Sequence, residues 1–108
     1  MSDTLAQIRV LVDQREVRMS QHGFRELAAD DILLDDVIAG VEAAIAIEEY
    51  PAFVRGPCVL VLQRDRNDLP LHVVWGIPRD RTAPAVLVTA YRPNPARWSA
   101  DFMRRVRS

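Results

Sequence analysis

Lysine is absent from this chain of 108 residues, so all 14 of its Lys/Arg side chains are arginines. Arginine presents a planar fork of donors that suits phosphate, and it also stacks on nucleobases. Cysteine occurs once, as Cys58, so no internal disulfide can form and a reducing cytoplasm is the expected compartment. The apolar runs are short, so we expect neither a membrane-spanning segment nor a signal peptide.

Charge is divided unequally between the two halves of the chain. Residues 1–54 carry four arginines against eleven acidic residues, a net charge of −7, whereas residues 55–108 carry ten against four, a net charge of +6. A basic half suits nucleic acid or an acidic protein partner, and a merely solvated surface is the alternative. The length predicts one domain over residues 1–108.

The first half predicts mainly helices. Apolar residues recur at helical spacing in residues 3–14, 20–31 and 34–45, and Ser20 is a good cap for the second of these. That second helix is expected to bury Phe24 with Leu27. Residues 16–20 alternate as a short edge strand does, whereas residues 45–50 fit a strand or a continued helix.

The second half predicts a sheet followed by a helix. Three β-prone runs, 57–65, 71–78 and 85–93, are separated by turn-forming residues and suit an antiparallel meander. Asn94 and Pro95 then favour a C-terminal helix that aligns Trp98 with Phe102. The expected fold class is therefore α+β, with N-terminal helices packed on an antiparallel sheet of about four strands and a C-terminal helix.

Strand alternation predicts which side chains share a sheet face. If the strands pair in the simplest register, Gln63, His72, Thr89 and Tyr91 lie on one mixed face, to which Leu87 also points, and the opposite face is apolar. A shift of one residue would break this set. The second strand then directs Leu71, Val73, Trp75 and Ile77 to the apolar face.

The mixed face offers groups suited to RNA cleavage. His72 titrates near neutral pH, Tyr91 supplies a phenol, and Arg64 and Arg92 supply positive charge. Cleavage needs the 2′-hydroxyl deprotonated, the leaving oxygen protonated and the phosphorane charge stabilised. The structural alternative is that His72 and Tyr91 are simply packed within the sheet. Trp98 and Phe102 of the C-terminal segment are candidates to cover half of the mixed face, and burial of His72 beneath that segment would argue against RNA cleavage.

The other histidine, His22, lies in a polar segment between the edge strand and the second helix. It is a catalytic candidate, or else a residue that fixes the strand-to-helix turn by bonding a backbone carbonyl or Glu26. No second His or Cys stands at ligand spacing, so we expect no zinc site and no other cofactor. Phosphate-binding loops and nucleophile elbows are also absent from the sequence.

Several segments together resemble the domain-of-unknown-function family 4258. They are "MSQHGFRELAADDI", "LDDVIAGV", "LHVVWGI" and "AVLVTAYRP", followed by the tryptophan of the last segment. The resemblance covers about residues 16 to 100, and Ser20, His22, Thr89 and Tyr91 carry its motifs. It implies a fold similar to the RelE/ParE and MqsR toxins, and a zinc-containing MqsA-type antitoxin as partner.

The chain departs from that family pattern at two positions. Many relatives have two arginines after the histidine where this chain has Glu26 and Asp30. The loss of two cations beside His22 makes phosphate binding there less favourable. Any catalytic centre is therefore expected on the sheet rather than at His22. Alternatively, these acids pair with Arg25 or Arg18 on the surface.

The resulting hypothesis is a toxin-like, metal-independent RNA endonuclease. His72, Tyr91 and, secondarily, His22 are its catalytic candidates, and Arg64, Arg92, Arg104 and Arg105 its RNA-binding candidates. A non-catalytic protein-binding module on the same fold is the alternative, and a gyrase inhibitor is a third reading. The cut site and the oligomeric state are left open.

Overall fold

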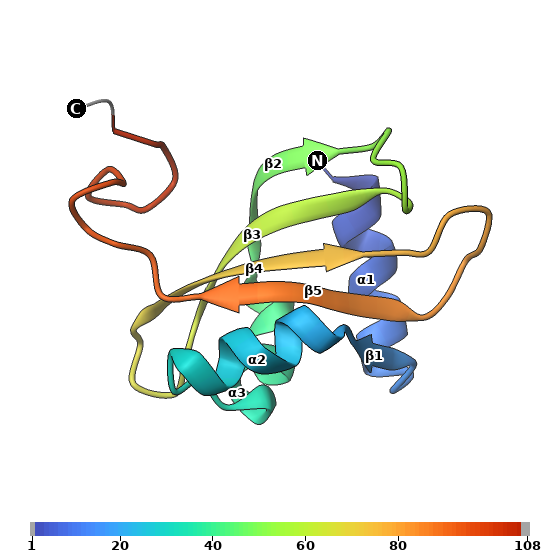
Figure 1. The fold of residues 1–108 in the computed structure, drawn as a ribbon, viewed down its shortest axis with the longest axis horizontal. Helices are drawn as coiled ribbons and strands as arrows, with labels where there is room; N and C mark the ends of the chain where they lie inside the picture. Colours follow the sequence, from blue (N-terminus) through green and yellow to red (C-terminus); the bar gives the residue numbers. More distant parts are fainter. Residues whose placement is uncertain (1, 107–108) are drawn as a thin grey trace.

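The computed structural model describes residues 2–106 (Figure 1). Its helices are α1 (Asp3–Asp13), α2 (Gln21–Ala29) and α3 (Leu34–Gly40), with the 3-10 turn η1 (Val41–Ala43). Its strands are β1 (Val17–Met19), β2 (Ile45–Tyr50), β3 (Cys58–Arg64), β4 (Pro70–Gly76) and β5 (Ala85–Tyr91). The α+β class is confirmed.

The sheet is mixed rather than wholly antiparallel. Its five strands run in the order β1-β5-β4-β3-β2, and β1 pairs with β5 in parallel while the other neighbours are antiparallel. The prediction of about four antiparallel strands is therefore wrong. Figure 1 shows α1 behind the sheet and α2 following β1 alongside β5. The buried side chains of the helices pack together on one sheet face.

The start of α2 explains the polar segment that precedes it. The Ser20 hydroxyl accepts a hydrogen bond from the Gly23 amide and donates one to the Val88 carbonyl oxygen. A Cβ on Gly23 would lie 2.7 Å from the Leu87 carbonyl oxygen, so only glycine permits this close approach. The helix is capped by Ser20 as predicted, and its first turn is tied to β5.

The predicted inward stripe of α2 is partly wrong. Leu27 is buried, but Phe24 is 63% exposed, because Gly23 and Leu27 face the sheet and Phe24 lies about 100° from Gly23 around the helix. The next helix is also shorter than predicted. It ends at Gly40, where a Cβ would lie 2.9 Å from the Gln63 side-chain nitrogen.

The predicted C-terminal helix is absent from residues 94–106, and Arg107 and Ser108 lie outside the described residues. The Asn94 side chain accepts from the Ala96 amide, and the Asp101 side chain accepts from Ser99 and from the Met103 amide. Such side-chain bonds compete with helical backbone bonds. We call residues 94–106 the tail: they form two turns joined by a bridge between Trp98 and Arg105.

The second sheet face, opposite the helices, differs from the predicted mixed face at two places. Leu62 pairs with His72, so Gln63 lies on the helix face, where it donates to the Val37 carbonyl oxygen and accepts from the Trp75 indole. A bulge between β4 and β5 also places Leu87 in the core beside Ala90. The bulge adds a residue and so reverses the alternation beyond it.

Candidate functional site

His72 and Tyr91 lie side by side on the second sheet face, as directly paired residues of β4 and β5. His72 Nε2 lies 2.8 Å from the Phe102 carbonyl oxygen, which can only accept, so Nε2 carries the proton. The other ring nitrogen, Nδ1, then accepts from the Tyr91 hydroxyl at 3.1 Å. The pair is a buried imidazole that holds a phenol in a fixed direction.

The tail covers this pair. The Trp98 ring meets the His72 ring edge-on with centroids 4.3 Å apart, and His72 is 0% exposed. Arg105 fastens the tail to the sheet edge, because its guanidinium bonds Glu48 of β2 at 2.9 Å and lies 5.1 Å from the Trp98 ring centroid. Packing, an ion pair and one backbone acceptor therefore hold the tail against the sheet.

Burial moves the pKa values of both members in the direction that keeps them neutral. Burial lowers the pKa of His72, an effect that the bond to Phe102 opposes and the charge of Arg105 reinforces. Burial likewise raises the pKa of Tyr91, against the lowering effect of Arg105. At neutral pH the pair is thus a neutral imidazole beside an intact hydroxyl.

A hollow of about 640 Å³ opens beside Tyr91, between the sheet and the tail. Arg97, Trp98 and Arg105 line it together with Tyr91. Tyr91 is half-buried, so it is the member of the pair that faces this space, while His72 lies behind it. Arginine and aromatic groups around one hollow suit a single-stranded nucleic acid, whose phosphates and bases they bind.

The four predicted RNA-binding arginines have different surroundings. Arg104 is exposed, and Arg105 is engaged with Glu48 and Trp98. Arg64 is also exposed, and it donates to the Asp68 carbonyl oxygen at 3.3 Å. The guanidinium of Arg92 is already bonded to Asp65 and Asp30.

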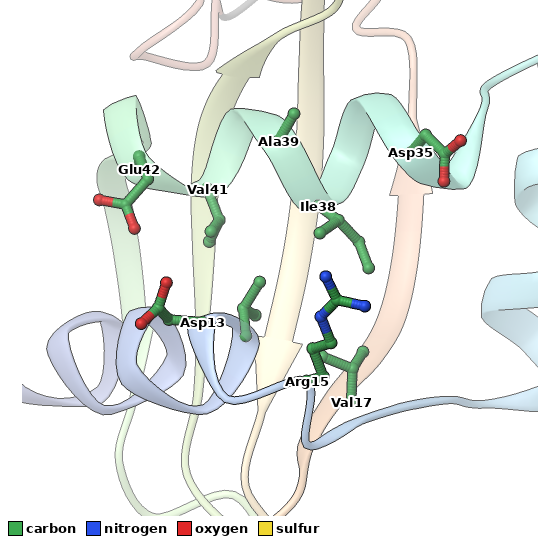
Figure 2. Close-up of a pocket in the computed structure, with 9 residues that line it drawn as sticks. Asp13, Arg15, Val17, Asp35, Ile38, Ala39, Val41 and Glu42 are labelled. Carbon is green, nitrogen blue, oxygen red and sulfur yellow. The ribbon is translucent and has the colours of Figure 1, made fainter.

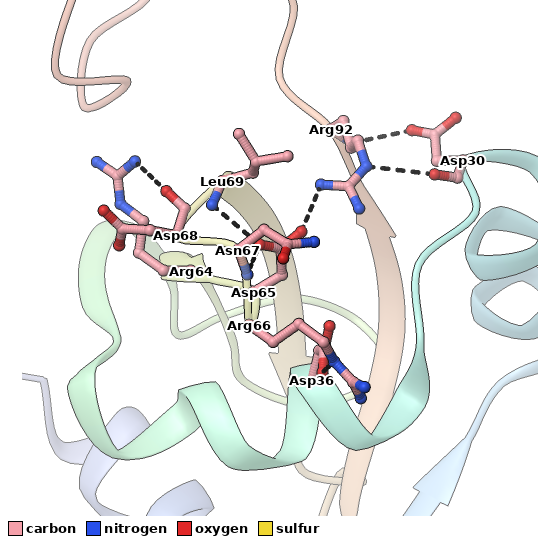
Figure 3. Close-up of polar contacts among 9 residues, drawn as sticks. All are labelled: Asp30, Asp36, Arg64, Asp65, Arg66, Asn67, Asp68, Leu69 and Arg92. Carbon is pink, nitrogen blue, oxygen red and sulfur yellow. Dashed lines mark hydrogen bonds and ion pairs between the residues drawn. The ribbon is translucent and has the colours of Figure 1, made fainter.

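Arg92 joins the end of β5 to two other segments (Figure 3). It donates to the Asp65 carboxylate at 3.1 Å and to the Asp30 carbonyl oxygen, and its amide donates to the Asp30 carboxylate. Burial raises the pKa of Asp65, but the amides of Leu69 and Asn67 together with Arg92 outweigh burial and lower it. Arg92 therefore acts here as the partner of a buried carboxylate.

The structure does not bring His22 to the pair of His72 and Tyr91. Its side chain is 65% exposed on the first turn of α2, 3.8 Å from Glu26. The alternative pairing of the two acids with Arg25 or Arg18 is not what the structure shows, because Glu26 lies beside His22 and Asp30 bonds Arg92. The acids at the two family arginine positions thus have partners of their own.

A second hollow, of about 550 Å³, lies between α1 and α3 on the other side of the molecule (Figure 2). Its lining combines Arg15 with the carboxylates of Asp13, Asp35 and Glu42, so it lacks the basic surface that a phosphate backbone needs. Within residues 2–106, no three His, Cys, Asp or Glu side chains are grouped so that they could hold a metal ion. No helix in the same range is long and apolar enough to cross a membrane.

Sequence reasoning named Trp98 and Phe102 as a cover for this face but missed Glu48, the acidic residue that attaches the tail. Glu48 stands in a segment that fitted strand or helix, and only a strand places it on the second sheet face. Arg105 and Trp98 were expected on a helix, where they would not have met as a bridge. The alternation of residues 45–50 was the available signal for Glu48, whereas the contacts of the tail are too distant in sequence to be read locally.

A family model matches most of the segments on which the resemblance to family 4258 rests. The chain belongs to the family described as domain of unknown function (DUF4258), whose model matches residues 19–92. That range begins at the end of β1 and ends just beyond β5, so it contains His22, His72 and Tyr91 but neither α1 nor the tail. No curated protein and no solved structure matches the chain.

Proposed function

We propose that this chain is a metal-independent RNA endonuclease of the toxin type, with a fold related to the RelE/ParE and MqsR toxins. The observation that carries the proposal is the Tyr91 hydroxyl, held by neutral His72 at the wall of a hollow lined by arginines. The protein would act in the cytoplasm, with a zinc-containing MqsA-type antitoxin as its partner. That partner follows from the family resemblance alone.

In the proposed reaction, RNA lies in the hollow beside Tyr91. The hydroxyl of Tyr91 takes the 2′-hydroxyl proton of the RNA while it passes its own proton to His72 Nδ1. The 2′ oxygen bonds to phosphorus, the bond from phosphorus to the 5′ oxygen breaks, and the 5′ oxygen leaves with a proton from solvent. His72 then returns its extra proton to solvent through Tyr91, which restores the neutral pair. The products are a 2′,3′-cyclic phosphate and a 5′-hydroxyl.

The arginines at the rim would stabilise charge on the phosphorane. Arg97 and Arg105 line the hollow, and Arg104 lies next to it along the tail. Arg105 would leave Glu48 for a phosphate, which is a favourable exchange because the exposed ion pair is weak. Arg64 would meet a more distant part of the RNA, and His22 is a secondary candidate on α2.

A protein-binding module without catalysis is the second candidate. It is favoured by the complete burial of His72, both of whose ring nitrogens already have hydrogen-bond partners. In that reading the pair fastens the tail to the sheet and carries no proton to or from a substrate. The two candidates differ in whether loss of the Tyr91 hydroxyl affects RNA.

Cleavage of an end-labelled RNA in EDTA tests the proposal. We expect fragments with 2′,3′-cyclic ends from the unmodified protein, and a rate at least about 100-fold lower for Tyr91→Phe, because proton transfer contributes that much or more. His72→Gln should lose activity similarly while it retains one donor and one acceptor. A second reaction with translating ribosomes covers activity that requires them.

Tyr50→Phe is the matched control, since it removes a phenol from β2 on the same sheet face and should cleave normally. Thermal unfolding of each variant establishes that it is folded. Equal cleavage by Tyr91→Phe and the unmodified protein would refute the mechanism. Intact RNA in both reactions would favour the binding module.

A further inference from the structure

The second sheet face has another half that the tail does not cover. There, Cys58, Gly76, Val86 and Val88 form the floor of an apolar groove of about 240 Å³, with Phe53 at its side. Drug-sized ligands fill larger pockets, of about 300 Å³ or more. The groove is therefore of a size to receive an apolar side chain of a larger molecule.

The groove is hollow because Gly76 has no side chain. A Cβ at Gly76 would lie 3.3 Å from Cys58 Cβ and 3.4 Å from a methyl group of Val88, so any larger residue would fill the floor. Phe53 beside it is 51% exposed, and Val54 is 68% exposed. Apolar groups gathered around an open hollow are typical of a binding surface.

Two loops frame the groove, residues 51–57 between β2 and β3 and residues 77–84 between β4 and β5, and they are hydrogen-bonded to each other. The Arg79 amide donates to the Arg55 carbonyl oxygen at 2.9 Å, and the Ile77 amide donates to that of Pro57 at 3.0 Å. Gly56 has φ +124°, and a Cβ there would lie 2.0 Å from the Ile77 carbonyl oxygen. Because the walls are already fixed, a ligand would lose little free energy in ordering them.

The rim of the groove is basic. Arg55 lines the groove, Arg79 and Arg81 follow the lining residue Pro78 on the second loop, and all three are exposed. Asp80 is the acidic residue between them; its carboxylate is 3.9 Å from Arg79, and its side chain is 91% exposed. Three arginines against one aspartate leave a positive rim around an apolar floor, which complements an acidic ligand with an apolar anchor.

The tail shows how a chain segment binds the neighbouring half of the same face. It places one aromatic side chain, Trp98, against His72 and secures itself with a single ion pair between Arg105 and Glu48. An apolar anchor beside a charge pair is therefore already used on this face. The uncovered half offers the same combination with the opposite charges. There the arginines are on the loops beside the sheet, so the segment that binds would carry the carboxylates.

We propose that this groove binds an acidic peptide segment of a partner protein. One aliphatic or aromatic side chain of the segment sits over Gly76, and neighbouring carboxylates pair with Arg55, Arg79 and Arg81. This binding does not depend on RNA cleavage, since the groove shares no lining residue with the hollow beside Tyr91.

Fluorescence anisotropy of a labelled probe with the full chain tests the proposal. The probe is a short peptide of glutamates around two central leucines, and its matched peptides replace the leucines by serines or the glutamates by arginines. We expect saturable binding of the first peptide alone, with a dissociation constant of about 100 μM or tighter. Cys58 is the sole cysteine and lines the floor, so the bound peptide should also slow its reaction with a small thiol reagent.

Variants locate the binding. Arg55→Glu, at the arginine that lines the groove, should weaken it at least about tenfold. Val86→Trp, which fills the groove, should abolish it. Arg104→Glu makes the same charge change on the tail, at the opposite end of the sheet in Figure 1, and should leave the affinity unchanged. The arginine variants alter exposed side chains, so they test the proposal even where Val86→Trp fails to fold.

Three results would overturn the proposal. One is the absence of saturable binding by the acidic leucine peptide. Another is equal binding of the serine peptide, or equal weakening by Arg104→Glu, because either would mean charge attraction without a groove. The third is a single-stranded RNA that displaces the peptide and is unaffected by Val86→Trp, which would make the rim a nucleic-acid site instead.

Discussion

The two halves of the sheet face opposite the helices are built from the same strands, yet only one half is covered. At one end the tail lies over His72 and Tyr91, and at the other the floor around Gly76 faces solvent. The covered half buries His72, whose ring needs hydrogen-bond partners, and the tail supplies one of them through the Phe102 carbonyl oxygen. The open half has short apolar side chains and no buried polar group that needs a cover.

The difference between the two halves shows how the tail stabilises the part of the sheet that it covers. Burying an imidazole without a partner is costly, so His72 is stable at 0% exposure only while Nε2 and Nδ1 are both bonded. An apolar hollow has no such requirement, and it can stay open until a ligand fills it. The covered half therefore depends on the tail for stability, whereas the open half is available for recognition.

The largest expected contrast is between one aromatic residue in each half. Trp98→Ala should lower the free energy of unfolding by about 3 kcal/mol, because a buried ring is lost and His72 is uncovered. Phe53→Ala should change it by less than about 0.5 kcal/mol, since that ring is half exposed. Urea unfolding measures both. Similar losses would mean that the tail contributes no more packing than an exposed loop.

The next contrast concerns two arginines near the covered half. Arg92→Met should lower the free energy of unfolding by about 2 kcal/mol, because the buried Asp65 carboxylate loses its cation but keeps two amide donors. Arg64→Met should leave stability unchanged and weaken RNA binding. Denaturation and RNA titration of the same samples separate the two effects. A stable Arg92→Met protein would show that the contacts in Figure 3 are dispensable.

A smaller effect is expected from pH. His72 has a lowered pKa in the folded protein, so between the folded and unfolded values the unfolded chain binds more protons. Stability is therefore full above about pH 6.5, the unfolded value, and falls as the pH decreases below it, by at most about 1.4 kcal/mol per pH unit. Chemical unfolding at several pH values measures this slope.

Two histidine variants test which residue causes this dependence of stability on pH. His72→Gln should remove it, and His22→Gln is the matched control on the exposed surface of α2. A slope that persists in His72→Gln would mean that other groups control the acid sensitivity. A slope that disappears in His22→Gln would mean that the histidine on α2, and not His72, causes the pH dependence of stability.

The smallest expected effect is that of the ion pair between Glu48 and Arg105. Both side chains are partly exposed, so a double-mutant cycle with Glu48→Gln and Arg105→Met should give a coupling of about 0.5 kcal/mol. The coupling should decrease in high salt, because salt screens exposed charges. A much larger value would make this pair, rather than Trp98, the main attachment of the tail.

The sequence predicted most of the elements and one face of the sheet. Leu71, Val73, Trp75 and Ile77 are buried together as their alternation indicated, and His72 and Tyr91 lie on the same face. Gln63 and Leu87 were assigned to the wrong faces. Alternation is a local property, whereas the register of two strands and the position of a bulge depend on the partner strand.

What the sequence determined by itself is therefore mainly local: helical stripes, strand runs and the Ser20 cap each rest on residues close together in the chain. Family membership also came from the sequence, through the order of several such segments over residues 19–92. Only the tertiary structure decided that the tail forms turns over His72, that Arg92 serves Asp65, and that Gly76 leaves a groove open. These features join residues far apart in sequence, and their free energy comes from burial and pairing that exist only after the chain has folded.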